Sequence, residues 1–214
     1  MVTKTATPGA TQVTISAPNF QTAVFTIRGT APYVQNKFSA KAKQMMMDKQ
    51  SAGSTAKKGT TRTAKDFDAQ YKGAMHIAEG GWNGIPASSF RCAMIDACRL
   101  VGFKMTHAKL GVFIEADGVD ADDGSPLVKF SKGTPERIDS MVKLATGVCD
   151  VAARPMWREW EAVLRIKFDA DMFLLVDITN LLARVGAQVG LGAGRPYSSD
   201  SAGCGWGVFE IING

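Results

Sequence analysis

The sequence predicts an α+β fold whose core elements follow the order strand, helix, strand, strand, helix, strand. Two observations lead to this prediction. β-branched and aromatic residues in near alternation indicate strands, and apolar residues that recur every three or four positions indicate helices. The chain has 214 residues, of which 45% are hydrophobic. That composition is ordinary for a globular protein with one substantial core.

A long segment of little periodicity separates the first strand from the first helix. Residues 22–29 alternate and end at a glycine, which predicts a strand. The helix is expected to begin after Pro86 with Ser88 or Ser89 as its N-cap, because a serine oxygen accepts hydrogen bonds from free N–H groups of the first turn. Its apolar stripe consists of Phe90, Met94, Ala97 and Val101.

The middle strands are predicted over 109–115 and, as a long strand, over 157–168, and a return strand over 126–130 follows an acidic turn in the segment between them. Without the insertions, a helix that begins near Asp177 and a closing strand over 206–211 complete the series. This order is the ferredoxin-like βαββαβ pattern, which RNA-recognition folds also use.

The other segments predict two insertions and a leader. We expect a single domain over 20–214, with insertions at about 30–85 and 116–156, and a flexible leader over 1–19. The leader lacks the basic region followed by an apolar one that defines a signal peptide. The sequence contains no run of 18 or more apolar residues, so it predicts no membrane span. A cytoplasmic location is therefore expected.

The cysteines and histidines do not predict a metal site. Four cysteines and two histidines are present, without a CxxC pair, whereas a zinc site needs four convergent ligands. Cys92 and Cys98 fall in the helical pattern and are expected to be buried free thiols. His76 and His107 have no recognisable partner, which favours a structural role over that of a general base. No catalytic residue and no cofactor are expected.

The positive charge is concentrated in one segment. The net charge of the chain is +5, but residues 37–72 alone contain nine basic and three acidic residues. Such clustering favours a polyanionic partner, with a solvated lysine-rich loop as the alternative. A short helix is expected within 37–50. The residues expected to contact phosphates in this segment are Lys37, Lys41, Lys43, Lys57, Lys58 and Arg62.

A glycine-rich loop with one arginine follows the second helix. Gly190, Gly192 and Gly194 permit a positive φ and a close approach of backbone to a partner, and Arg195 can hold a phosphate with its guanidinium. A dinucleotide fingerprint would follow a strand and open a helix, so this loop is not one. The alternative is a helix C-cap with a flexible turn.

The start of the first helix is the second candidate phosphate site. Ser88 and Ser89 lie where backbone N–H groups point out of the helix, and such an N-terminus attracts anions. Arg91 and Arg99 could lie along the same side of the helix and follow a nucleic-acid backbone. The alternative is an ordinary capped helix with arginines in solvent.

These motifs resemble a known family. IPASSFRCAMIDACR (residues 85–99) looks like the helix-one motif of the RAMP (repeat-associated mysterious protein) superfamily. VGLGAGRPYSSDSAGCGWGVFEI (residues 189–211) resembles its C-terminal glycine-rich loop and last strand, and FTIRGTAPYVQNKFS (residues 25–39) fits its first strand and exit loop. The ending is similar to that of phage-encoded proteins of unassigned role and of the backbone subunit of CRISPR effector complexes.

The resemblance implies a ferredoxin-like palm that polymerises along single-stranded nucleic acid. It maps the family's basic helix position to Arg91 and its loop residues to the three glycines and Arg195. The basic insertion would correspond to elements that clasp the strand or the neighbouring subunit. Some members cut RNA with an Asp in the loop after the first strand, and residues 29–38 contain none.

We therefore expect a protein that binds single-stranded RNA or DNA without sequence preference and forms a homo-oligomer or helical filament. If the chain is phage-encoded, the bacterial host cytoplasm would be its location. A structural protein that assembles with protein partners is the first alternative. An RNA-processing nuclease is the second and less favoured one.

Overall fold

The computed structural model describes residues 16–38, 40–51, 64–143, 149–198 and 203–213. Residues 1–15 of the predicted leader and the side chain of Lys41 lie outside the described part of the chain. So do Lys57, Lys58 and Arg62, three of the residues predicted to bind phosphate. Within the described segments, no helix combines the length and the apolar character that crossing a membrane requires.

Seven strands of the described segments form an antiparallel main sheet. They are β1 (Phe20–Gly29), β3 (Gly84–Pro86), β4 (Val112–Glu115), β5 (Gly118–Val119), β6 (Pro126–Lys132), β9 (Glu161–Asp169) and β10 (Phe209–Asn213). Their order is β10-β1-β9-β6-β3. Strand β4 also pairs with β9, and β5 pairs with β6. The β1–β9 register places Phe25 opposite Leu164, both of them buried.

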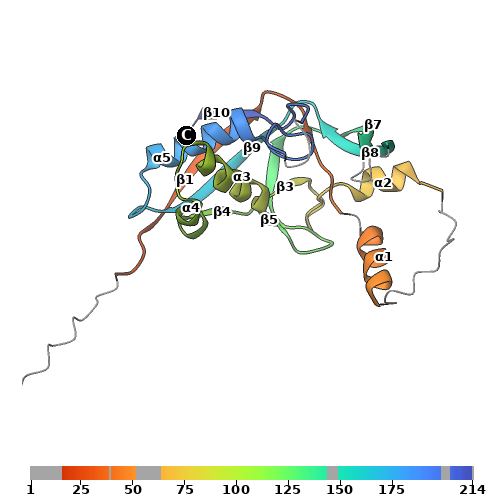
Figure 1. Ribbon diagram of the computed structural model, residues 1–214, viewed down its shortest axis with the longest axis horizontal. Helices are drawn as coiled ribbons and strands as arrows, with labels where there is room; N and C mark the ends of the chain where they lie inside the picture. The colour runs from red at the N-terminus through yellow and green to blue at the C-terminus, as the bar shows by residue number, and fades with distance from the viewer. Residues whose placement is uncertain (1–15, 39, 52–63, 144–148, 199–202, 214) are drawn as a thin grey trace, which may run out of the picture.

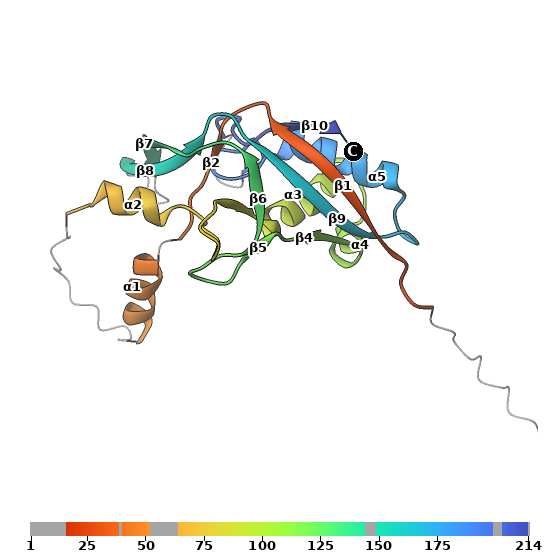
Figure 2. The same cartoon turned by 180° about the vertical axis from the view of Figure 1, so that it is seen from behind.

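A second sheet of three strands lies at one end of the main sheet. It has the order β2-β8-β7, with β2 (Tyr33–Val34), β7 (Glu136–Lys143) and β8 (Cys149–Trp157). Helix α2 (Phe67–Gly73) packs on β8, where Gln70 accepts a hydrogen bond of 3.0 Å from the Ala153 N–H. Helix α1 (Ala40–Ser51) extends from the body at the same end (Figures 1 and 2).

Helices α3 (Ala87–Leu100) and α5 (Leu175–Arg184) cover one face of the main sheet, in front of it in Figure 1 and behind it in Figure 2. A π-helical turn, Val185–Val189, follows α5, and α4 (Met105–Gly111) precedes β4. The core lies between the helices and the sheet. Its buried residues include Phe25, Ile27, Leu164 and Ile166 from strands and Phe90, Met94, Ile178 and Leu182 from helices. The predicted α+β class is confirmed.

Two predicted strands were wrong in extent. Residues 109–111 belong to α4, so only 112–115 form a strand. Residues 157–168 are not one strand, because β8 ends at Trp157 and β9 begins at Glu161. Trp157 stacks on Phe130 at 4.8 Å, and Trp160 donates to the Ala31 carbonyl at 2.9 Å. Both indoles enter one core, so the apolar pattern continues while the backbone turns between two sheets.

The first residues of α3 and of the closing strand also differ from the prediction. The N-cap of α3 is Pro86, without a side-chain cap, and neither Ser88 nor Ser89 caps the helix. The reason is that β3 pairs with β6 up to Pro86 and Leu127, so the helix begins directly at Ala87. Both serines thus lie within the first turn. The closing strand begins at Phe209, three residues later than predicted, because the glycine-rich loop extends to Gly207.

Candidate functional site

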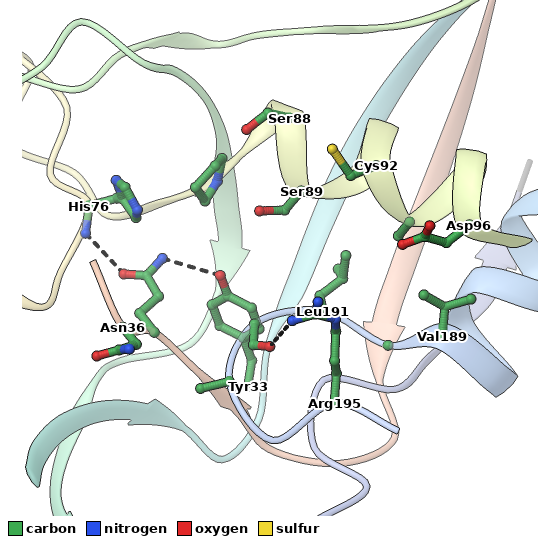
Figure 3. A pocket seen from close by; sticks show the side chains of 16 residues that line it. Tyr33, Asn36, His76, Ser88, Ser89, Cys92, Asp96, Val189, Leu191 and Arg195 are labelled. Carbon is green, nitrogen blue, oxygen red and sulfur yellow. Dashed lines mark hydrogen bonds between the residues drawn. The ribbon is translucent and has the colours of Figure 1, made fainter. Parts of the chain in front are cut away.

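The first turns of α3 and the glycine-rich loop form opposite walls of a cavity of about 400 Å³ (Figure 3). Ser88, Ser89 and Cys92 line it from the helix. Gly190, Gly192 and Arg195 line it from the loop. These two segments lie about a hundred residues apart in the sequence. The fold therefore brings together most of the residues that the two sequence motifs singled out.

The glycines of the loop are required by the loop's own folding. Gly190, Gly192 and Gly194 have φ angles of 71°, 72° and 73°, a region that other residues rarely adopt. A Cβ on Gly192 would lie 2.4 Å from the Val34 carbonyl oxygen, and one on Gly194 would lie 2.6 Å from the Trp206 ring. The space that we expected for an approaching partner is thus filled, at these two positions, by the protein itself.

Three backbone donors of the loop nevertheless remain available. The N–H groups of Leu191 and Ala193 donate within the protein, at 3.0 and 2.9 Å. Those of Gly192, Gly194 and Arg195 have no acceptor among the described residues. The Arg195 guanidinium donates to the Gly192 carbonyl at 3.2 Å and pairs with no carboxylate of the described segments. Gly192 and Arg195 line the cavity, whereas Gly194 does not, so two free N–H groups and an unneutralised guanidinium favour an anion at this wall.

A buried charge network extends from the cavity to the segment before α1. His76, which lines the cavity, bonds through Nδ1 to Asp120 at 2.8 Å. Lys37 donates to Asp120 at 2.6 Å and to Asp122 at 2.7 Å. The side chain of Asp120 is fully buried and that of Lys37 is 5% exposed. The Asp120 carboxylate therefore holds both the imidazole and the ammonium in place.

The hydrogen bonds of this network outweigh the cost of burial. Burial opposes the charge of Lys37, yet the two carboxylates raise its pKa above the ordinary value. Burial likewise opposes the charge of Asp120, but hydrogen bonds from Lys37, the Asp122 N–H and His76 lower its pKa. Both groups are therefore charged over a wide pH range. Lys37, which we predicted to bind phosphate, instead neutralises carboxylates of its own chain.

The remaining predicted site residues lie away from the cavity. Arg91 donates to the Val112 and Lys109 carbonyls and lies over the Phe113 ring. Arg99 donates to the Tyr197 hydroxyl at 3.3 Å. Lys43 is exposed on α1. The two arginines thus do not follow the cavity as a pair.

Several cavity residues were missed by the sequence analysis. Gln35 is buried and accepts a bond from the His76 N–H at 3.0 Å, and Asn36 and Asp96 also line the cavity. No local pattern marks these residues, because their neighbours come from distant segments. Cys92 was expected to be buried and is exposed, since it lies on the side of α3 that faces the cavity. Cys98 is buried, as predicted.

Two glycines of the same loop provide a matched test of its folding. Gly205 and Gly207 have φ angles of 76° and 70°, but a Cβ meets nothing within 4 Å at Gly205 and lies 1.9 Å from the Leu191 carbonyl oxygen at Gly207. We expect Gly205→Ala to cost about 1–2 kcal/mol, the usual penalty of this conformation. Gly207→Ala should cost about 3 kcal/mol or more, because backbone must also move. Urea unfolding measures both, and equal losses would contradict this packing.

Neither a scan against protein-family models nor a search of curated proteins finds a match to this chain. Function is therefore inferred from the residues of the cavity and from their chemistry.

Proposed function

We propose that this protein binds single-stranded nucleic acid without sequence preference at the cavity between α3 and the glycine-rich loop, and that it oligomerises along the strand. One observation carries the proposal. Two segments that were each predicted to bind phosphate from sequence alone line one cavity, although about a hundred residues separate them. Convergence of independent motifs on one cavity is unexpected if each motif only serves packing.

The chemistry of the two walls supports a phosphate ligand. Ser88 and Ser89 of the first turn of α3 line the cavity, so the positive end of the helix dipole lies beside it, and no side chain caps this end of the helix. The opposite wall offers the free N–H groups of Gly192 and Arg195 and the Arg195 guanidinium. Backbone donors read no base sequence, which fits binding without sequence preference.

The sheet supports a ferredoxin-like core and, with it, the resemblance to the RAMP superfamily. In that core the last strand flanks the first, and the first pairs with the third. Here β10 pairs with β1, β1 pairs with β9, and β4 and β6 share the outer edge of β9. We infer that β4 and β6 together take the place of the second strand. Helices α3 and α5 then correspond to the two crossover helices of the pattern.

The proposal is tested by fluorescence anisotropy with labelled dT30 and rU30 at salt concentrations from 50 to 300 mM. We expect affinity to fall with salt, with a log–log slope of about −0.7 for each phosphate contacted. Arg195→Ala should weaken binding about tenfold, as loss of a charge-assisted contact predicts. Wild-type affinity in this variant, or no binding by the wild type, would remove the proposal. Shortening of rU30 during the assay would indicate RNA processing instead.

Assembly through protein contacts is the second candidate. Met45, Met46 and Met47 on α1 are each at least half exposed, and methionine suits adaptable protein interfaces. If these residues serve protein assembly alone, oligomers should persist after nuclease treatment and in high salt. Light scattering after size exclusion distinguishes the two, because strand-templated oligomers dissociate when the nucleic acid is digested.

A further inference from the structure

Arg154 differs from every other arginine in the described segments, because its side chain forms no hydrogen bond or ion pair with another described residue. Arg28, Arg137, Arg158 and Arg165 pair with carboxylates. Arg91, Arg99, Arg184 and Arg195 donate to neutral oxygen atoms of the protein. The guanidinium of Arg154 has neither kind of partner.

This unpaired charge is also partly withdrawn from solvent. Arg154 is partly buried on β8, and its Nε is shielded from solvent. Burial lowers the pKa of the guanidinium, although arginine stays protonated at any physiological pH. A charge that loses water without gaining a partner destabilises the folded protein. Such an arrangement is expected where a ligand supplies the missing counter-ion.

The position of Arg154 links it to the cavity. The Gln35 N–H donates to the Pro155 carbonyl at 3.1 Å, which extends the pairing of β2 with β8 beyond Val34 and Met156. The next pair in this register is Asn36 with Arg154, and residues directly opposite on antiparallel strands have Cβ atoms about 5 Å apart. Asn36 lines the cavity. This register therefore places Arg154, which does not itself line the cavity, next to a lining residue and on the side of the β7–β8 hairpin.

We propose that Arg154 binds a backbone phosphate of the same strand that occupies the cavity, and so directs the strand from the glycine-rich loop toward the β7–β8 hairpin. This inference rests on the proposed function and deepens it, because it assigns a binding residue and a direction to the path. The phosphate provides the counter-ion that the free protein lacks. A guanidinium matches two phosphate oxygens at once, which offsets the cost of its burial.

The test compares Arg154→Met with Arg158→Met, two variants of equal net charge. Arg158 is exposed and pairs with Glu136 at 2.7 Å. With labelled dT30, we expect Arg154→Met to bind about tenfold more weakly than the wild type, with a salt slope shallower by about 0.7. Its melting temperature without nucleic acid should stay equal or rise, because an unpaired charge is removed. Arg158→Met should bind within about twofold of the wild type.

Any other result for these two variants would contradict the inference. Equal binding by the two variants would show that Arg154 contacts no phosphate. A lower melting temperature for Arg154→Met would mark the residue as structural. If that variant fails to fold, phenylglyoxal modification of wild-type protein gives the answer by mass spectrometry. Bound dT30 should protect Arg154 and leave Arg158 reactive, and equal reactivity with and without dT30 would contradict the inference. If wild-type protein binds no strand, the proposed function itself fails.

Discussion

Lys37→Met is expected to lower the free energy of unfolding by about 3–5 kcal/mol, the usual cost of removing one partner from a buried ion pair. Asp120 would keep its bonds from His76 and the Asp122 N–H, but its fully buried carboxylate would lose the ammonium 2.6 Å away. Denaturant unfolding at pH 7 measures the loss. The double variant Lys37→Met/Asp120→Asn should recover most of it, because both charges are then absent.

A second lysine of the basic segment is the matched control. Lys43 is exposed on α1, so Lys43→Met should change stability by about 0.5 kcal/mol or less. Comparable losses at Lys37 and Lys43 would contradict the description of Lys37 as part of a buried network. The two variants also distinguish a buried ion-pair partner from an exposed surface lysine. The sequence alone does not make this distinction, since both lysines lie in one basic stretch.

The ion pair of Lys37 and Asp120 also makes the free energy of unfolding depend on pH. The pKa of Asp120 is lowered, so its stabilising effect is present above its ordinary value and is lost as the pH falls through the folded-state value. The pKa of Lys37 is raised, so its effect is present below its ordinary value and is lost as the pH rises through the folded-state value. The stability difference between wild type and the double variant should therefore be largest between about pH 4 and pH 10.

Local sequence patterns predicted the elements that are determined by residues close together in the sequence. Of the predicted stripe, Phe90, Met94 and Ala97 are buried on α3, because a helix with one apolar side must turn it toward the core. Val101 follows the helix as its C-cap and is exposed, so the stripe ends one position earlier than predicted. Asp177 lies at the start of α5, where its carboxylate accepts a bond of 2.9 Å from the Leu174 N–H. These signals depend on residues three or four positions apart, which a sequence displays directly.

Contacts between distant segments could not be predicted in this way. The network of Lys37, His76 and Asp120 joins three segments, and none of them carries a motif that names the others. In the sequence alone, His76 therefore has no recognisable partner. The cavity walls were recognised separately because a helix start and a glycine-rich loop each attract anions by local geometry. That they face each other follows from the packing of α3 against the π-helical turn at Val185–Val189, which leads into the loop.

Ser88→Glu should weaken binding of a single strand about tenfold or more at low salt, while leaving the protein as stable as before. Ser88 is exposed in the first turn of α3 and lines the cavity. A carboxylate there is favoured by the helix dipole, by about 0.3–1 kcal/mol. The same carboxylate repels a phosphate about 4 Å away by about 1–4 kcal/mol, depending on the local dielectric. Loss of binding without loss of stability thus distinguishes a ligand site from a structural one.

Ser88→Gln is the matched control, because it has nearly the same size as Ser88→Glu and no charge. Its affinity should stay within about threefold of the wild type. Raising the salt to 1 M should reduce the gap between the two variants, since the Debye length falls to about 3 Å. Equal affinity of the Glu and Gln variants at low salt would show that the phosphates of the strand do not bind at the start of α3. A gap that shrinks with salt, in proteins of equal stability, would locate the strand at the start of α3, opposite the glycine-rich loop.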